Sequence, residues 1–512
     1  MGIVCGFSIP HDGKMKSRDR RLGRRRGTLI ALVLALALPS VVSVSSGQAT
    51  SLAPLAEPSV VGVWGAPFEV GVIAVHSVLL PNGRVLMVSR PRPGKPTKAR
   101  VWNPSTGSSV DVTPADASRD LYCAGHSLLD SGLAFYAGGN RLMGSRDGLA
   151  NTDTFDPASQ DWDTGPLMSQ ARWYPTNAVL PNGRVLILGG WISPGNWSNT
   201  INEYNPVTNS MTQRPASATM KVGLYPRMHL LANGKLFHSS VTTNKLGSTS
   251  RTFDPATNSW SAGDTLNFGA RADGISVQLP GLDKILVFGG SLKNTSKATN
   301  TVETIDTSAT NPQWSYSTPM NKARKEGNSV VLPDGTVLAV GGAAGPGQYE
   351  NPVLQAEAFD PEDESWTPLA SQVASRMHHS TALLLPDGRV LSAGGDRGAY
   401  QTKAEIFSPP YLFEGPRPQI TTAPAAVSYG QTFDLTSESA ADIASISLIK
   451  PGSVTHSTSF DQRFLDLEYT RDSQTLHVGA PASAAQAPPG DYMMFIVNSA
   501  GVPSVASWVH VG

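Results

Sequence analysis

The sequence predicts an all-β protein made of a propeller of seven repeated sheets and a smaller β-sandwich at the C-terminal end. Three observations lead to this prediction. A hairpin pattern recurs seven times, a second turn marker recurs in phase with it, and both stop near residue 410, where a different strand-rich region begins. The segments between turns are short and apolar and show no helical period of useful length, which favours strands.

The repeated unit is an apolar run, usually an Asn-Gly or Asp-Gly turn, a second apolar run and often a closing Gly-Gly pair. Glycine accepts the positive φ that such a turn needs, so the pattern is a strong local signal for a hairpin. A spacing of roughly 50 residues is typical of kelch-type propeller blades, each a four-stranded antiparallel sheet. The seven copies lie at residues 79–88, 128–139, 179–190, 230–240, 278–290, 331–342 and 383–395.

The second marker is an aromatic or aliphatic residue followed by a turn, after each hairpin. Its seven copies begin at Trp102, Phe155, Tyr204, Phe253, Ile305, Phe359 and Phe407. Four of them have a tryptophan a few residues on: Trp162, Trp260, Trp314 and Trp366. Two markers in phase over seven copies leave little room for chance, so we expect a seven-bladed propeller over residues 55–415.

Neither marker continues beyond the propeller. The sequence Gly-Pro-Arg-Pro at residues 415–418 is typical of a stiff linker, and strand-like segments follow to the end of the chain. A region of about 100 residues with this pattern predicts an immunoglobulin-like β-sandwich. We assign it to residues 416–512, with an eighth blade as the alternative.

The first 49 residues have the features of an export signal. A cluster of arginines between Arg18 and Arg26 precedes an apolar run at residues 28–38, and small residues follow. The run is too short to predict a membrane-spanning helix. Residues 1–49 are therefore expected to be a secretory signal, with the twin-arginine route open. We expect a secreted protein or one associated with the cell envelope, and an uncleaved N-terminal anchor is the alternative.

Charge and cysteine content narrow the possible partners. The chain has 40 basic and 40 acidic residues, but the N-terminal segment is basic, so the remainder is mildly acidic. This argues against nucleic acid as a partner, and we expect a monomer. The two cysteines are Cys5 and Cys123. Because Cys5 would leave with the signal, the Cys123 thiol is buried and inert, pairs between chains, or has chemistry of its own.

Candidate reactive residues lie at corresponding places in different repeats. Cys123 precedes the second hairpin, Tyr174 the third, and His378 and His379 the seventh. Residues at one position of each repeat gather on one face of a propeller, so these four can meet. Taken singly, a cysteine is usually a small buried apolar residue. Adjacent histidines on a strand point to opposite faces, so we expect at most one of them to face a site.

Several long segments resemble one family, the copper radical oxidases that include galactose oxidase and glyoxal oxidase. The resemblance covers nearly the whole chain after the signal and is closer to the glyoxal oxidase branch. It rests on the segments DLYCAG, ARWYPTNAVLPNGRV, LYPRMHLLANGKLF, RMHHSTALLLPDGRV, EIFSPPYLF, VTHSTSFDQR and PPGDYMMFIVNSAGVPSVAS.

The resemblance implies a mononuclear copper held by His379, His456 and Tyr174, with an open position for water or substrate. It also implies a thioether between Tyr174 and Cys123, which holds one oxidising equivalent as a radical. The implied activity is a copper-dependent oxidase that acts on aldehydes, primary alcohols or glycans and reduces O2 to hydrogen peroxide. His456 would reach this centre from the C-terminal domain.

The chain departs from the family pattern at one position. The family has an axial tyrosine directly before the copper histidine, and here that residue is His378. A histidine can also accept a proton, so His378 is the candidate base. The alternative is a catalytically impaired propeller that binds glycans or proteins. The family's stacking tryptophan corresponds to Trp191 or Trp197, and we assign Trp191 to substrate binding.

Overall fold

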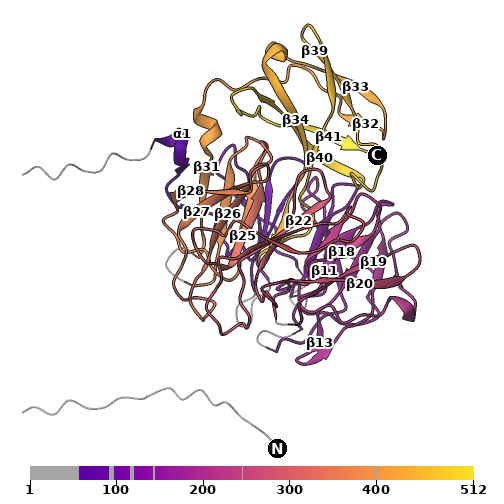
Figure 1. Ribbon diagram of the computed structural model, residues 1–512. Coiled ribbons are helices and arrows are strands. Elements are labelled where there is room, and N and C mark those ends of the chain that lie inside the picture. Colours follow the sequence, from indigo (N-terminus) through magenta and orange to yellow (C-terminus); the bar gives the residue numbers. More distant parts are fainter. Residues whose placement is uncertain (1–56, 91–96, 116–119, 142–144, 245, 398–400) are drawn as a thin grey trace, which may run out of the picture. The chain divides into compact units, whose positions relative to one another are not determined.

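Strands form almost all of the regular structure in the computed structural model of the chain (Figure 1). It describes residues 57–90, 97–115, 120–141, 145–244, 246–397 and 401–512. Within these ranges the helical elements are α1 (Pro58–Val61) and the 3-10 turns η1 (Ala216–Ala218), η2 (Pro410–Phe413) and η3 (Ala440–Asp442). The prediction of an all-β chain is confirmed. No helix of the described residues is long and apolar enough to cross a membrane. The predicted signal at residues 1–49, with Cys5, lies outside the described residues.

Seven antiparallel sheets follow one another along the described part of residues 63–408, and each contains one of the predicted hairpins. The first holds β3 (His76–Leu79), β4 (Val85–Val88), β5 (Ala99–Trp102) and β6 (Ser109–Asp111), and the second holds β7 (Gly125–Leu128), β8 (Ala134–Ala137), β9 (Thr152–Phe155) and β10 (Trp162–Thr164). The third holds β11 (Thr176–Val179), β12 (Val185–Leu188), β15 (Asn202–Asn205) and β16 (Ser210–Gln213), and the fourth holds β17 (Met228–Leu230), β18 (Leu236–His238), β19 (Thr249–Asp254) and β20 (Ser259–Thr265). The fifth holds β21 (Ile275–Gln278), β22 (Lys284–Phe288), β23 (Val302–Asp306) and β24 (Ser315–Ser317), and the sixth holds β25 (Lys325–Val331), β26 (Val337–Ala343), β27 (Gln355–Asp360) and β28 (Ser365–Ser371).

The seventh sheet joins strands from both ends of the repeat region. It is built from β29 (Ser380–Leu384), β30 (Val390–Gly394) and β31 (Lys403–Ser408), with β1 (Val63–Trp64) and β2 (Phe68–Glu69) paired antiparallel to β31. This sheet also lies against the first one, because the hydroxyl oxygens of Ser77 in β3 and Thr381 in β29 are 2.8 Å apart. The last repeat therefore contacts the first.

Glycines at two places let the repeats form and pack. The hairpins turn at glycines such as Gly183, which has a φ of 74° between the paired residues Val179 and Val185. The closing Gly-Gly pairs allow close approach between neighbouring sheets. A Cβ on Gly341 would clash with the carbonyl oxygen of Arg376 in the next repeat. The Gly-Gly pairs thus mark contacts between sheets as well as strand ends.

A buried arginine binds the Gly-Gly segment in four of the repeats. Arg172, Arg271, Arg324 and Arg376, which we name the clamp arginines, donate to the carbonyl oxygens of Gly189, Gly289, Gly341 and Gly394 at 2.7–2.9 Å. Arg271 and Arg324 also pair with buried glutamates on the third strand of their sheets, Glu303 at 2.7 Å and Glu357 at 2.6 Å. Each clamp fixes the loop that leads into the first strand of its repeat.

The four tryptophans of the second marker each connect their own sheet to the one before it. The indole N–H of Trp162 in the second sheet donates to the carbonyl oxygen of Val112, which follows the first sheet, at 2.6 Å. Trp366 in the sixth sheet donates to the carbonyl oxygen of Thr318, which follows the fifth, at 3.0 Å. The position of these tryptophans in the sequence therefore reflects packing between repeats.

Two further sheets form the C-terminal region, drawn in orange and yellow in Figure 1. One has the order β32 (Ala426–Val427), β41 (Ser507–Val511), β40 (Gly490–Asn498), β34 (Ile443–Lys450) and β37 (Arg463–Asp466), and the other has the order β33 (Thr432–Thr436), β39 (Thr475–Gly479) and β38 (Tyr469–Asp472). Leu435 and Leu476 of the second sheet share a buried core with Ile446 and Ile496 of the first. Two sheets on one apolar core are the architecture of a β-sandwich.

One hairpin of the C-terminal region leaves the sandwich and joins the first repeated sheet. β35 (Ser453–Thr455) pairs with β36 (Thr458–Ser459) on one side and with β3 on the other. Its two turn residues, His456 and Ser457, both have positive φ, at 44° and 63°, as the tight turns of two-residue hairpins require. This hairpin carries His456 into the repeat region.

Candidate metal centre

Five residues at one position of the repeat surround the candidate site. Each stands nine places before the turn glycine of its own hairpin: Cys123, Tyr174, Tyr225, Glu326 and His379. All five have a left-handed backbone with φ between 44° and 66°, a conformation that costs a residue other than glycine about 1–3 kcal/mol. The Tyr174 N–H donates to the Cys123 carbonyl oxygen at 3.0 Å, and the Tyr225 N–H donates to the Tyr174 carbonyl oxygen at 2.8 Å. The repeat itself therefore brings distant residues together.

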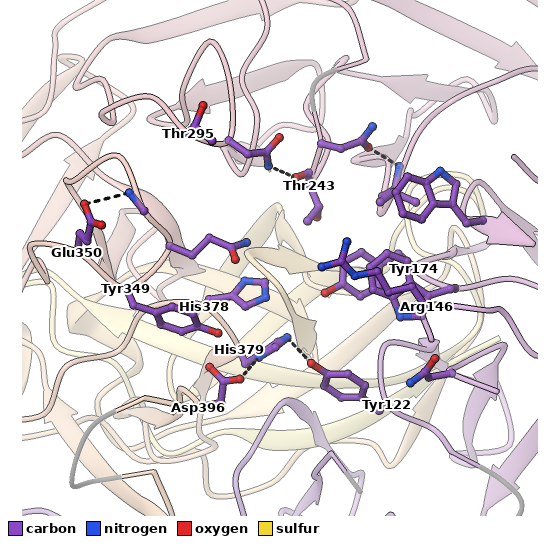
Figure 2. A pocket seen from close by; sticks show the side chains of 18 of the residues that line it. Tyr122, Arg146, Tyr174, Thr243, Thr295, Tyr349, Glu350, His378, His379 and Asp396 are labelled. Carbon is purple, nitrogen blue, oxygen red and sulfur yellow. Dashed lines mark hydrogen bonds and ion pairs between the residues drawn. The ribbon is translucent and has the colours of Figure 1, made fainter. Parts of the chain in front are cut away.

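His379 presents one ring nitrogen to the site and is held by the other. Its Nδ1 lies 3.0 Å from Oδ2 of Asp396, and its Nε2 lies 3.1 Å from the hydroxyl oxygen of Tyr122 (Figure 2). Burial lowers the pKa of His379 to about 4, so the ring is neutral at physiological pH. The negative charge of the nearby carboxylate favours a proton on Nδ1, which leaves the Nε2 lone pair free to bind a metal.

His456 is oriented in the same way by a different partner. Its Nδ1 lies 2.6 Å from Oγ1 of Thr455, which itself donates to the carbonyl oxygen of Val75 at 2.8 Å. That hydroxyl must then accept from Nδ1, so the lone pair of His456 is on Nε2, which lies 3.9 Å from Sγ of Cys123. Burial lowers the pKa of His456 well below its usual range. Arg227 holds the His456 carbonyl oxygen at 2.8 Å.

Cys123, His379 and His456 form a group of potential metal ligands. One ligand atom of each lies within 4.8 Å of the others, and all three residues are buried. Cys123 is a free thiol, and it packs with Tyr174 in one buried cluster. Burial raises the pKa of both Cys123 and Tyr174. Three sequence-predicted residues thus meet in one group, and Tyr174 contacts it. Imidazole and sulfur ligands suit copper.

Aromatic rings enclose Tyr174 on both faces. Trp173 stacks on it with ring centroids 3.8 Å apart, and Tyr225 stacks at 4.5 Å. The expectation that Trp191 or Trp197 stacks on Tyr174 is wrong. Trp191 packs against Trp173 at 5.5 Å instead, and it lines the pocket described below. Because Tyr174 is left-handed, its ring lies beside that of the preceding residue, which the sequence alone does not reveal.

His378 lies beside the three-residue group without belonging to it. Its Nδ1 is 2.8 Å from Oε2 of Glu326, and the same glutamate accepts from Nε2 of Gln348 at 2.9 Å. Burial lowers the pKa of His378, but the charge of Glu326 and its hydrogen bond outweigh burial and raise that pKa overall. The His378 and His379 ring centroids are 3.7 Å apart.

The expectation that only one of the two histidines faces the site is wrong. Both line the same pocket, and neither is in a strand, since β29 begins at Ser380. In the third and sixth repeats the left-handed residue follows its clamp arginine by two positions, as in Arg172 and Tyr174. In the seventh repeat His379 follows Arg376 by three positions. With this extra residue in the loop, His378 as well as His379 lines the pocket.

A pocket of about 850 Å³ opens onto these residues (Figure 2). Tyr174, His378 and His379 form part of its wall. Tyr122, Tyr349 and Asp396, which the sequence argument did not single out, also line it. The spacing of nine residues before the turn glycine could have identified Tyr225 and Glu326, but no comparable signal marks Tyr122 or Asp396.

Two protein families match this chain, and together they cover most of its length. Residues 106–258 and 280–411 match the family described as "Glyoxal oxidase N-terminus". Residues 417–511 match the one described as "Galactose oxidase-like, Early set domain".

Individual proteins that are similar to this chain are oxidases of the same kind. A galactose oxidase from Gibberella zeae is 30% identical over 94% of this chain and 75% of that protein. An aldehyde oxidase, GLOX, from Vitis pseudoreticulata is 30% identical over 78% of this chain and 83% of that protein. A fungal alcohol oxidase of the AA5 family, solved in complex with copper, superposes with a TM-score of 0.77 at 26% identity, over 88% of this chain and 99% of that one.

Proposed function

Because the chain belongs to the copper radical oxidase family of galactose oxidase and glyoxal oxidase, we propose that it is a secreted, copper-dependent oxidase of small aldehydes or primary alcohols, including those of glycans. It would reduce O2 to hydrogen peroxide. We propose further that residues 1–49 direct export, that residues 55–415 form a closed seven-bladed propeller, and that residues 416–512 form the sandwich. The pairing of β1 with β31 supports closure of the ring.

The copper ligands in this proposal are Tyr174 and the Nε2 atoms of His379 and His456. The observation that supports this set most strongly is the buried group of Cys123, His379 and His456, with ligand atoms within 4.8 Å of one another. Both histidines have their Nδ1 engaged by other groups, so each offers a lone pair to the same region. When bound, copper would supply a one-electron redox centre and a Lewis-acidic position for a substrate oxygen.

Cys123 and Tyr174 would form a thioether cross-link. A carbon–sulfur bond replaces the thiol S–H and a ring C–H next to the phenol oxygen, and O2 accepts the two electrons and two protons as hydrogen peroxide. The packing of Cys123 and Tyr174 in one buried cluster supports this assignment. Stacking of Trp173 and Tyr225 on the two faces of Tyr174 would shield a radical on that ring from solvent.

The reaction removes two electrons and two protons from an alcohol or an aldehyde hydrate and transfers them to O2. His378 lies in the pocket wall as the candidate acceptor of the substrate hydroxyl proton, with Glu326 holding its Nδ1. Trp191, which also lines the pocket, is the candidate residue for substrate contact. Both roles rest on position in the pocket.

A second candidate function is binding without turnover. The family's axial tyrosine is replaced by His378, and that residue is engaged by the buried carboxylate of Glu326. A propeller that keeps this pocket but has lost the proton acceptor could still bind a glycan or protein segment.

A peroxide-coupled assay separates the two functions. The protein is loaded with copper in air and tested against a panel of aldehydes, primary alcohols and glycans, with His379→Ala as the control that should lack activity. Peroxide that depends on substrate, copper and His379 supports the oxidase. A protein that binds copper and forms the cross-link but yields no peroxide from any member of the panel would favour the binding function.

A further inference from the structure

The hydroxyl of Tyr122 points at the one ring nitrogen of His379 that a metal would occupy. Its oxygen lies 3.1 Å from Nε2, and the two rings meet edge to face with centroids 5.3 Å apart. Because Nδ1 of His379 faces Asp396, Nε2 carries the lone pair and the Tyr122 hydroxyl donates to it. A metal bound at Nε2 would take over this lone pair, so the hydroxyl must find another partner.

The loop that carries Tyr122 holds it in this orientation. Its backbone N–H donates to Oδ1 of Asp120 at 3.0 Å, and the same carboxylate oxygen accepts from Thr97 at 2.9 Å. The next residue, Cys123, is left-handed and buried. Tyr122 is therefore fixed by the same turn that delivers the thiol to the site, and its hydroxyl lies in the pocket wall beside His379 (Figure 2).

The separation of the two atoms suits neighbouring ligands of one ion. A metal–imidazole bond is about 2.0 Å, and Cu(II) favours tetragonal arrangements in which adjacent bonds are near right angles. An oxygen with a slightly longer bond at a right angle to Nε2 would lie roughly 3 Å from that nitrogen. The observed 3.1 Å between Nε2 and the Tyr122 oxygen agrees with this value.

Neither His378 nor Tyr349 fits the position of a metal ligand next to Nε2 of His379 as well as Tyr122 does. His378 is outside the group whose ligand atoms lie within 4.8 Å of one another, and its Nδ1 faces Glu326. Tyr349 packs its ring against that of His378, with centroids 5.9 Å apart. Of these three pocket residues, Tyr122 alone has a described hydrogen bond to a metal-facing nitrogen.

We propose that Tyr122 is a second phenol ligand of the copper ion, in addition to Tyr174. This inference rests on the proposed function and deepens it. On binding, the Tyr122 O–H bond breaks, its proton leaves through the pocket to solvent, and an oxygen–copper bond forms without any change of oxidation state. The loop of the second repeat would then supply the phenol that is missing at position 378 of the seventh.

The test is a titration of copper-free protein with Cu(II) under anaerobic conditions, which prevents formation of the cross-link. It compares wild type, Tyr122→Phe and Tyr316→Phe, a matched change at an exposed tyrosine of β24, by the visible phenolate-to-copper absorption and by competition with a chelator. Tyr122→Phe keeps the ring that packs on His379, so its fold should be retained. We expect it to lose part of the absorption and about tenfold in copper affinity, while Tyr316→Phe matches wild type.

Two results would overturn the assignment of Tyr122. One is a Tyr122→Phe protein whose absorption and affinity equal those of wild type, and the other is an equal change in Tyr316→Phe, which would reflect an effect unrelated to the pocket. Failure of wild type to bind stoichiometric copper would instead contradict the proposed function as a whole. The titration therefore distinguishes failure of the inference from failure of the function on which it rests.

Discussion

The loops that lead into the first strands of the repeats hold two kinds of residue, the clamp arginines and the left-handed residues, which differ in one respect. The arginine is the same residue in four repeats and makes the same bond to a glycine carbonyl oxygen each time. The left-handed position carries a thiol, two phenols, a carboxylate and an imidazole in different repeats. The repeated backbone thus sets where side chains point, and the residue at that one position sets the chemistry.

The largest effect on stability is expected at a clamp. Arg324→Ala leaves Glu357 buried without its partner and should lower the free energy of unfolding by about 3–5 kcal/mol. Denaturant unfolding of copper-free protein measures this. Arg184→Ala is the control, since Arg184 forms a half-exposed pair with Glu203 and should cost at most about 1 kcal/mol. Equal losses in the two variants would contradict the role of the clamp.

His379→Ala should lower copper affinity strongly and stability only slightly. We expect copper affinity to fall at least about 100-fold, which corresponds to roughly 2.7 kcal/mol, because one imidazole ligand is lost. The stability of the copper-free protein should change much less than in Arg324→Ala. Equilibrium dialysis against Cu(II) measures binding, with His477→Ala as the control. His477 is 39% exposed and pairs with Asp434 in the C-terminal region. Undiminished copper uptake by His379→Ala would rule out this ligand set.

Asp396→Asn should lower copper affinity, but less than His379→Ala does. The carboxylate faces Nδ1 of His379 and fixes the tautomer that leaves Nε2 free. Loss of such a partner typically costs about 10–100-fold in metal affinity. The same dialysis should give a value between those of wild type and His379→Ala. A value equal to that of wild type would show that Asp396 does not orient the ligand.

The smallest effect on copper affinity is expected for Trp173, whose ring covers that of Tyr174. Trp173→Leu removes a stacked aromatic pair worth about 0.5–1.5 kcal/mol and should leave copper affinity within a few-fold of wild type. The lifetime of the Tyr174 radical, followed by its optical absorption after oxidation, should shorten. Trp197→Leu serves as the comparison, because Trp197 contacts Trp191 and not Tyr174. A radical that decays faster in Trp197→Leu than in Trp173→Leu would reverse this assignment.

Much of this arrangement could be predicted from the sequence. Turn glycines and Gly-Gly pairs act locally, so the hairpins were found at their observed places, as with Val179 and Val185 on either side of Gly183. Cys123, His379 and His456 meet as expected because the first two occupy one position of a repeated backbone and His456 is carried in by a hairpin turn.

The sequence predictions are wrong where the backbone departs from a regular strand. Alternation along a strand does not apply to His378 and His379, because His379 is left-handed and the loop has one extra residue after Arg376. The same left-handed turn puts Trp173 on Tyr174. Tyr122 reaches His379 from the second repeat, and Asp396 reaches it from the loop between β30 and β31 of the same repeat, and no local spacing encodes such contacts.

If the shared repeat position unites Cys123 and Tyr174 at a copper centre, exposure to copper and air should join their side chains. The intact mass of the protein before and after this exposure, together with thiol titration, detects the bond. We expect loss of one pair of hydrogen atoms and disappearance of the Cys123 thiol, with neither change in Cys123→Ser. An unchanged mass and a fully reactive Cys123 thiol after copper loading in air would contradict this proposal.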